Sequence, residues 1–72
     1  DMDVFREMST NISRTSNNIN QIAKRINTTS IIYKDDLEDL KSLLEKQAKD
    51  ILSMRKKIYS LTYSNSFNTE KK

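Results

Sequence analysis

Glycine and proline are both absent from this sequence of 72 residues. Average usage of about 7% glycine and about 5% proline would place several of each in a chain of this length. These two residues make most tight turns and most breaks in regular structure, so their absence argues against short strands joined by hairpin turns. We therefore predict an all-α chain of long helices with very few connections.

Histidine and cysteine are absent as well. Histidine is the commonest general base and metal ligand, and cysteine supplies thiolate nucleophiles and disulfides. Without glycine, a phosphate-cradling loop cannot form either. We therefore expect that the chain is not an enzyme and holds no metal or cofactor. The lack of cysteine is compatible with a cytoplasmic protein.

Long apolar runs are also missing. No run approaches the roughly 18 residues that a membrane span requires, and no signal-peptide pattern is present. We therefore expect no membrane association. The chain begins at Asp1 rather than at methionine, which leads us to expect a fragment of a longer protein.

Apolar side chains in the first part of the sequence return at alternating spacings of three and four residues. This is the pattern of a helix that buries one narrow seam. It predicts a helix over about residues 2–27, with a threonine as the single polar member of the seam. The predicted seam consists of Phe5, Met8, Ile12, Thr15, Ile19, Ile22 and Ile26.

The same spacing returns further along and predicts a second helix over about residues 35–63. Its predicted seam consists of Leu37, Leu40, Leu44, Gln47, Ile51, Met54, Ile58 and Leu61. The two seams are out of phase, because continuing the first would place Asp36, Asp50 and Lys57 at core positions. One straight helix therefore cannot bury both seams against the same partner surface.

The change of phase falls in residues 28–34, which are β-branched and poor in helix formers. We predict a break there, with Thr28, Thr29 and Ser30 as candidates for capping the second helix. Residues 64–72 have lost the periodicity and are predicted to form a frayed tail.

Two helices of this length have a thin core when they pack as an isolated pair. We therefore expect self-association into a coiled-coil-like assembly or a four-helix bundle, as a two-fold dimer or a higher oligomer. The break is compatible with two arrangements. The first helix either folds back as one arm of a hairpin or extends as a stalk that pairs with its copy.

Charge alternates in blocks along the chain. Residues 10–34 carry a net charge of +4 without any acid, and residues 35–54 carry a net charge of −3. In a helical hairpin these two blocks can lie near each other. We favour this self-compensating, solvated arrangement for the middle of the chain.

Residues 14–27 form a polar, basic segment that is rich in asparagine. Asparagine is a poor helix former, so helix propensity does not account for this composition. Helical spacing places several of the polar side chains on a shared side. The candidate contact residues are Arg14, Asn17, Asn18, Asn20, Gln21, Lys24 and Arg25.

Three interpretations of this segment are open. Asparagine and glutamine can contact adenine edges and arginine can contact guanine or phosphate, which would make the segment a DNA-contacting surface. Alternatively, Asn18 and its neighbours form inter-helix polar contacts that set the register, as buried asparagine does in coiled coils. A third interpretation is a docking surface for a partner protein. Composition alone favours the register role, while the lack of acids keeps nucleic-acid contact open.

The order of these residues resembles a signature of the MobC-like mobilisation proteins, which are relaxosome accessory factors of mobile plasmids. The resemblance covers about residues 12–60 and departs at Ser16, where the family often has glycine. The residues that carry it are Arg14, Asn17, Asn18, Asn20, Gln21, Ile22 and Ala23.

This resemblance implies a bacterial, cytoplasmic protein that supports conjugative mobilisation without being a nuclease. Such proteins help a relaxase to recognise and nick the origin of transfer. In many relatives an upstream ribbon-helix-helix module binds the DNA, and no strand-like basic segment precedes Asp1 here. We therefore expect DNA recognition mainly from a missing N-terminal module. The present chain is expected to oligomerise and to dock the relaxase or the coupling protein.

Two other functions remain open from the sequence. The chain is alternatively a structural coiled-coil domain of an unrelated assembly, whose asparagines serve only to fix the register. Otherwise it is a DNA-binding helical domain in its own right, with an affinity that falls steeply as the salt concentration rises.

Overall fold

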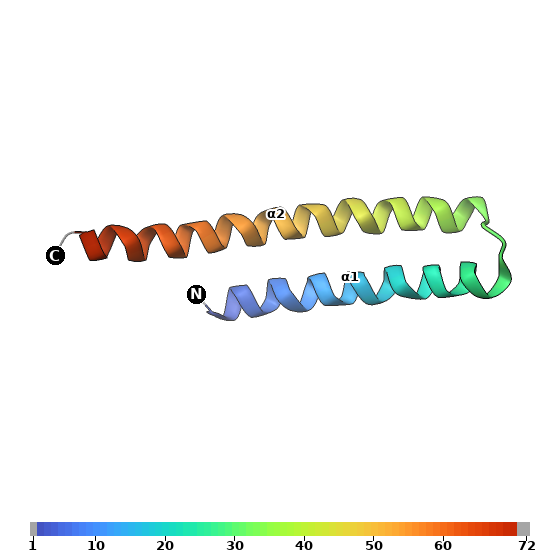
Figure 1. Cartoon of the computed structure of the whole chain (residues 1–72), viewed down its shortest axis with the longest axis horizontal. Coiled ribbons are helices and arrows are strands. Elements are labelled where there is room, and N and C mark those ends of the chain that lie inside the picture. Colours follow the sequence, from blue (N-terminus) through green and yellow to red (C-terminus); the bar gives the residue numbers. More distant parts are fainter. Residues whose placement is uncertain (1, 71–72) are drawn as a thin grey trace.

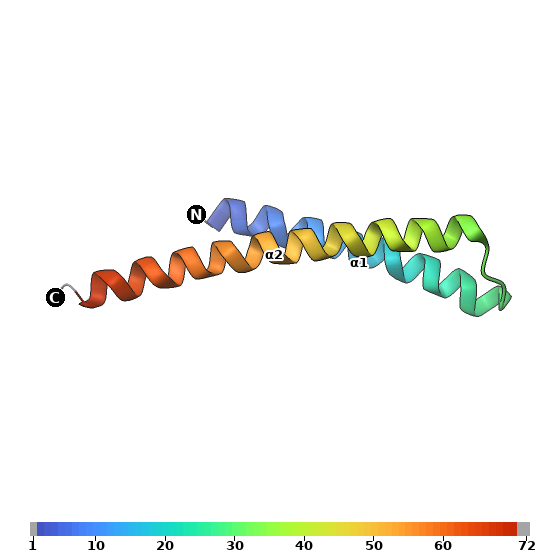
Figure 2. The same ribbon diagram turned by 90° about the horizontal axis from the view of Figure 1, so that it is seen from above.

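The computed structural model describes residues 2–70, with side chains described through residue 62. Helix α1 (Met2–Thr29) and helix α2 (Lys34–Glu70) run antiparallel and form a hairpin (Figure 1). Seen from above, the two helices cross each other rather than lying strictly side by side (Figure 2). The all-α prediction is confirmed, and of the two predicted arrangements the chain adopts the hairpin rather than the stalk.

The helices are longer than the sequence pattern suggested. Helix α1 continues to Thr29 and helix α2 continues to Glu70. From the apolar spacing we predicted that the two helices would end near residues 27 and 63. No glycine or proline is present to stop either helix, so loss of apolar periodicity alone does not end it. Residues 71–72 of the predicted tail lie outside the described residues.

The end of α1 is closed by a residue in the left-handed conformation. Ser30 has φ 57°, and its backbone N–H donates a hydrogen bond of 2.7 Å to the Ile26 carbonyl. This is the αL type of helix C-cap, in which glycine usually occupies the left-handed position. The Thr29 hydroxyl accepts a hydrogen bond of 3.2 Å from the Ile31 N–H and so satisfies one more backbone group of the turn.

The prediction that Thr28, Thr29 or Ser30 caps the second helix is wrong. The Thr28 hydroxyl donates to the Lys24 carbonyl at 2.8 Å, and Ser30 ends α1 as just described. The first backbone hydrogen bond of α2 runs from the Leu37 N–H to the Tyr33 carbonyl at 3.1 Å. Tyr33 therefore occupies the N-cap position. The three hydroxyl residues lie too early in the turn to reach it.

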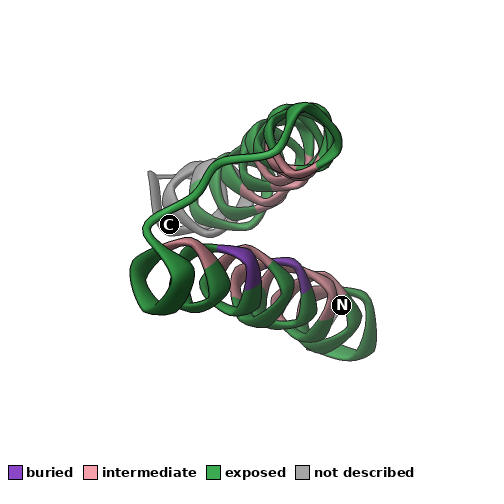
Figure 3. Ribbon diagram, turned by 90° about the vertical axis from the view of Figure 1, so that its right-hand side faces the viewer, coloured by how far each residue is buried: buried purple, intermediate pink, exposed green. Residues whose placement is uncertain are grey.

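The predicted seam of α1 is the face that contacts α2. All seven of its members are buried or half-buried, and Thr15 and Ile22 are the most buried, with exposed fractions of 3% and 7%. Figure 3 shows these residues on the side of α1 that is turned toward α2. The spacing of three and four residues was sufficient to find this face because α1 has only one apolar side.

The predicted seam of α2 is mostly wrong. Of its eight members Leu40, Gln47 and Met54 are half-buried against α1, but the other five remain exposed, namely Leu37, Leu44, Ile51, Ile58 and Leu61. The half-buried residues of α2 are Asp36, Leu40, Leu43, Gln47, Asp50, Met54 and Lys57. These positions continue the phase of the α1 seam, so the predicted shift of phase does not occur.

Charged residues can occupy this seam because a two-helix hairpin leaves its edges open to water. Asp36 forms an ion pair with Arg25 of α1, with 2.7 Å between its Oδ1 and Nη2 of the arginine. Asp50 is paired within α2 to Lys46 at 2.9 Å. Both carboxylates are partly buried and keep a charged partner, which avoids the cost of an unpaired charge.

A polar layer crosses the middle of the hairpin. The Gln47 side-chain amide donates a hydrogen bond of 2.6 Å to the Ser16 hydroxyl. One residue away, Lys46 Nζ donates to the Thr15 hydroxyl at 3.4 Å, and Thr15 in turn donates to the Asn11 carbonyl at 3.0 Å. The two predicted polar seam residues, one from each helix, thus lie at the same level and fix the register of the pair.

Substituting Ile22 with alanine should lower the free energy of unfolding by about 2–4 kcal/mol, because the side chain is buried and leaves a cavity. The matched control is Ile31→Ala in the exposed connection, which should change it by less than about 0.5 kcal/mol. Urea denaturation followed by circular dichroism gives both values. Equal losses in the two variants would contradict the seam described here.

Substituting Ser30 with glycine should raise the free energy of unfolding by about 0.5–1 kcal/mol, because glycine adopts positive φ without a Cβ clash. Ser30→Ala is the control, since it removes the hydroxyl and keeps the Cβ, and it should give no gain. The urea midpoints of the two variants and of the parent chain decide the matter. A glycine variant that is less stable than the alanine variant would refute the C-cap assignment.

Candidate partner-binding surface on α1

The seven candidate contact residues of α1 are all exposed. They lie within four turns of a single helix and are spread over several of its sides. The set comprises Arg14, Asn17, Asn18, Asn20, Gln21, Lys24 and Arg25. The helix holds their backbone positions fixed, while the side chains are free to meet a partner.

Four of these residues form a row along the side of α1 that is turned away from α2. Arg14, Asn17, Gln21 and Lys24 follow one another at spacings of three and four residues, as the seam residues do. The seam residues Thr15 and Ile22 each come directly after a member of this row, so the two rows lie on different sides of the helix. We call Arg14, Asn17, Gln21 and Lys24 the outer stripe.

The other three candidates do not belong to the outer stripe. Asn18 and Arg25 lie beside the seam, where they line a shallow groove of about 340 Å³ between the two helices. Gln21 also reaches this groove, whose opposite wall is formed by Asp39 and Ser42 of α2. Asn20 lies on the other flank of α1. The structure thus divides the predicted set into an outer stripe, a groove edge and one separate asparagine.

The groove adds residues that the sequence analysis did not single out. Asp39 and Ser42 face Arg25 and Asn18 across the groove only because α2 folds back on α1 in this register. Thr28 joins Gln21 and Lys24 in a second shallow depression near the end of α1. Helical spacing alone could have added Thr28, which lies four positions after Lys24, but the two α2 residues could be found only from the antiparallel pairing.

Over the part of the chain whose side chains are described, no asparagine takes part in a hydrogen bond between the helices. Among the described side chains, the contacts that cross the hairpin join Thr15 to Lys46, Ser16 to Gln47 and Arg25 to Asp36. Within the hairpin the register is therefore set by threonine, serine and glutamine. The amides of Asn17 and Gln21 point to no partner in α2 and are exposed to solvent.

The acid-free segment of α1 lies beside the acidic half of α2. The ion pair between Arg25 and Asp36 and the contact between Thr15 and Lys46 fix this pairing. Arg25 is already neutralised by its carboxylate partner, so the outer stripe offers only the charges of Arg14 and Lys24. The surface is therefore rich in amides and only mildly positive.

Two further properties bear on the range of functions. Neither helix, over the part of the chain that the structure describes, is long and apolar enough to cross a membrane. Over the same residues, no group of three or more acidic side chains converges in a way that could hold a metal ion.

Comparison with known protein families identifies the family of this chain. The profile of the bacterial mobilisation protein (MobC) family matches residues 10–51, which is more than half of the chain and includes the outer stripe. The chain therefore belongs to this family. No curated protein and no solved structure gives a significant match.

Proposed function

We propose that this member of the family assists plasmid mobilisation as a relaxosome accessory protein in the bacterial cytoplasm. In this role it acts as an oligomer and docks the relaxase or the coupling protein at the origin of transfer. It contributes a binding surface rather than a catalytic group. Family membership supports the mobilisation role, and the exposed outer stripe of α1 supports the docking role.

The outer stripe is the observation that carries the proposal. Each asparagine in a helix costs about 0.5–0.7 kcal/mol relative to alanine. The hairpin recovers none of this cost, because the contacts between α1 and α2 are made by other side chains. Exposed amides that folding does not require are suited to hydrogen bonding with another molecule. A rigid helix presents them at fixed separations of one turn.

A protein partner suits the outer stripe better than DNA does. Proteins that bind duplex DNA neutralise several phosphates, often about six to ten. The outer stripe supplies two cations, and the neighbouring Arg25 is held by Asp36. The acids of α2 that lie beside α1 weaken the local positive potential further. We therefore assign sequence recognition of the origin mainly to a module outside residues 1–72.

Direct DNA contact by this chain is the second candidate. It is favoured by the placement of Asn17 and Gln21 between Arg14 and Lys24 on one exposed helix face. An exposed helix fits the major groove, where amide side chains pair with adenine and arginine pairs with guanine. The same residues serve both candidates, so binding experiments must separate them.

Replacing the four residues of the outer stripe, Arg14, Asn17, Gln21 and Lys24, with alanine should lower plasmid transfer by about tenfold or more, because a docking surface loses several hydrogen bonds at once. The helix content should stay equal or rise, since alanine is the better helix former. Mating assays give the transfer frequency, and circular dichroism gives the helix content.

The control for this variant replaces Lys49, Ser53 and Ser60 with alanine, three exposed residues on α2 away from the outer stripe. It should transfer normally. If both variants lost transfer equally, the outer stripe would have no special role. If the α1 variant unfolded, its side chains would be structural and the docking proposal would fail.

The chain alone should bind duplex DNA weakly and without preference for the origin of transfer over a scrambled duplex. The affinity should fall when salt is raised from 50 to 200 mM, because it rests on a few phosphate contacts. Fluorescence anisotropy at the two salt concentrations measures this. Tight binding that prefers the origin at the higher salt would place DNA recognition within this chain.

A further inference from the structure

A row of apolar side chains remains uncovered on α2. Its exposed fractions are 58% at Leu37, 50% at Leu44, 51% at Ile51 and 45% at Ile58. These four residues recur every seven positions, and Ala48 lies between the middle two. We call Leu37, Leu44, Ala48, Ile51 and Ile58 the apolar face of α2.

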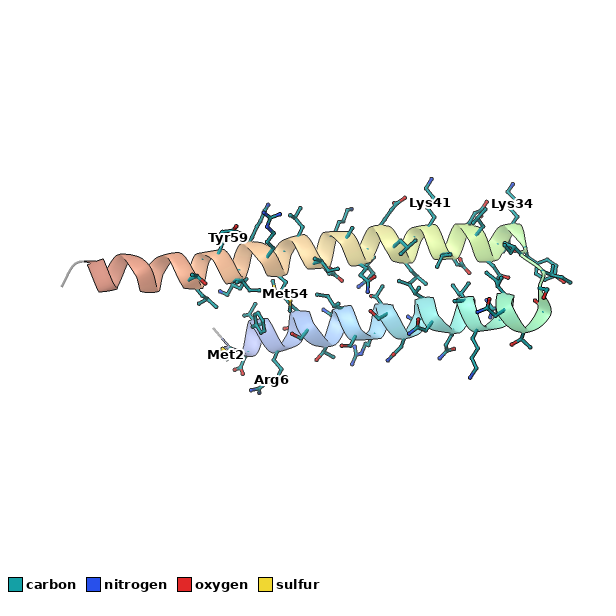
Figure 4. The ribbon with its side chains drawn as sticks, in the orientation of Figure 1. Met2, Arg6, Lys34, Lys41, Met54 and Tyr59 are labelled. Carbon is teal, nitrogen blue, oxygen red and sulfur yellow. The ribbon has the colours of Figure 1, made fainter. Side chains whose placement is uncertain are left out.

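This face is distinct from the one that contacts α1. Leu44, Ile51 and Ile58 each come directly after a seam residue of α2, which places them about 100° further around the helix. Figure 4 shows the difference at two labelled residues, since Met54 lies between the helices and Lys41, beside Leu44, points away from α1. A second helix can therefore pack on the apolar face while the hairpin stays intact.

The apolar face is also hollowed. Leu37, Leu40, Leu44 and Ala48 line a shallow depression of about 600 Å³, with Glu38 and Lys41 at its rim. Ala48 is smaller than the leucines that line the depression with it, so it leaves space for a side chain of a partner helix. A row of this kind with a polar rim is characteristic of a helix-packing surface rather than of a solvated one.

The buried core of the hairpin is small compared with the apolar surface that α2 leaves exposed. Among the described residues only Thr15 and Ile22 are buried. Burying leucine and isoleucine side chains is the main source of stability in helix packing, and the four large residues of the apolar face lie outside this small core. The apolar face spans about 32 Å from Leu37 to Ile58.

The pattern of the apolar face is complementary to itself when reversed. In an antiparallel pair of α2 helices, Leu37 of one copy lies opposite Ile58 of the other, and Leu44 lies opposite Ile51. A two-fold interface requires this property, because the same patch must fit itself. The even spacing of seven residues satisfies it along the full length of the apolar face.

The charges that flank the apolar face favour the same orientation. Beside the apolar face, the acids Glu38 and Glu45 lie in the first half of α2 together with the base Lys41, and the bases Arg55 and Lys56 lie toward its end. Antiparallel pairing brings acids of one copy beside bases of the other and opposes the two helix dipoles. Parallel pairing would instead align the two helix dipoles.

We infer that the apolar face of α2 binds a second copy of this chain in antiparallel orientation, which produces a two-fold four-helix assembly. The inference rests on the oligomer in the proposed function and names the surface that forms it. Because the contact lies on α2, the outer stripe of α1 stays uncovered in both copies. The dimer therefore presents two docking surfaces related by the two-fold axis.

Sedimentation equilibrium of the chain tests the contact. The mass should be twice the monomer mass of 8.5 kDa. Leu44→Asp with Ile51→Asp should raise the dimer Kd by about a hundredfold, because two charges per copy enter the apolar contact. The control, Ser53→Asp with Ser60→Asp, adds the same charge at exposed positions off the apolar face and should stay dimeric. A monomeric parent chain, or equal dissociation of both variants, would overturn the inference.

Disulfide trapping tests the orientation, since the chain has no cysteine of its own. Oxidising a mixture of Leu37→Cys and Ile58→Cys chains should give the mixed disulfide. Neither variant alone should cross-link efficiently, because identical residues lie about 30 Å apart in the antiparallel pair and a disulfide needs Cα atoms within about 7 Å. Cross-linking of Leu37→Cys with itself, or no mixed disulfide, would refute the antiparallel contact.

Docking through the outer stripe and dimerisation through the apolar face can be refuted independently of each other. The alanine variant of α1 leaves the apolar face intact, so its mass must stay that of a dimer even where transfer is lost. A dimeric chain whose alanine variant transfers normally would refute docking through the outer stripe alone. A monomeric chain whose alanine variant loses transfer would refute the dimer contact alone.

Discussion

The hydrogen bond between Gln47 and Ser16, with the adjacent contact between Lys46 and Thr15, fixes how the two helices align. Sliding α2 by one heptad would break both of these contacts. Their loss would cost about 0.5–1.5 kcal/mol for each hydrogen bond. The ion pair of Arg25 with Asp36 then follows from the same alignment, eleven positions earlier on α2. The groove beside Asn18 and the exposure of the outer stripe depend on it too.

The alignment determines which side of α2 is left for other contacts. Two packed helices share one narrow seam, and α2 has more apolar surface than that seam can cover. Turning Gln47 and Asp36 toward α1 therefore turns Leu44 and Ile51 toward solvent. The partly exposed ion pair adds little to stability by itself. The ion pair matters because it helps to determine which of the two apolar sides of α2 packs against α1.

The sequence was sufficient to predict α1 in detail and α2 only in outline. Helix α1 has a single apolar side, so the spacing of Phe5 through Ile26 identified the buried face. In α2 both Leu43 and Leu44 are apolar, and local spacing cannot say which one meets α1. That choice is made by Thr15 and Ser16, about thirty positions away, and becomes visible only with the hairpin. The exposure of Asn17 and Gln21 followed from helical spacing, but the absence of hydrogen bonds from these two side chains to the described side chains of α2 did not.

The short connection between the helices makes the hairpin unevenly secure along its length. Contacts near the turn close short loops, as between Arg25 and Asp36, while Thr15 and Lys46 are 31 residues apart. Loop entropy alone makes the more distant contact about 0.9 kcal/mol more costly to close. Contacts beyond it, toward Phe5, close longer loops still, so the arms separate first at the open end. The segment that carries Gln21 and Lys24 lies near the turn and is among the last parts of α1 to detach.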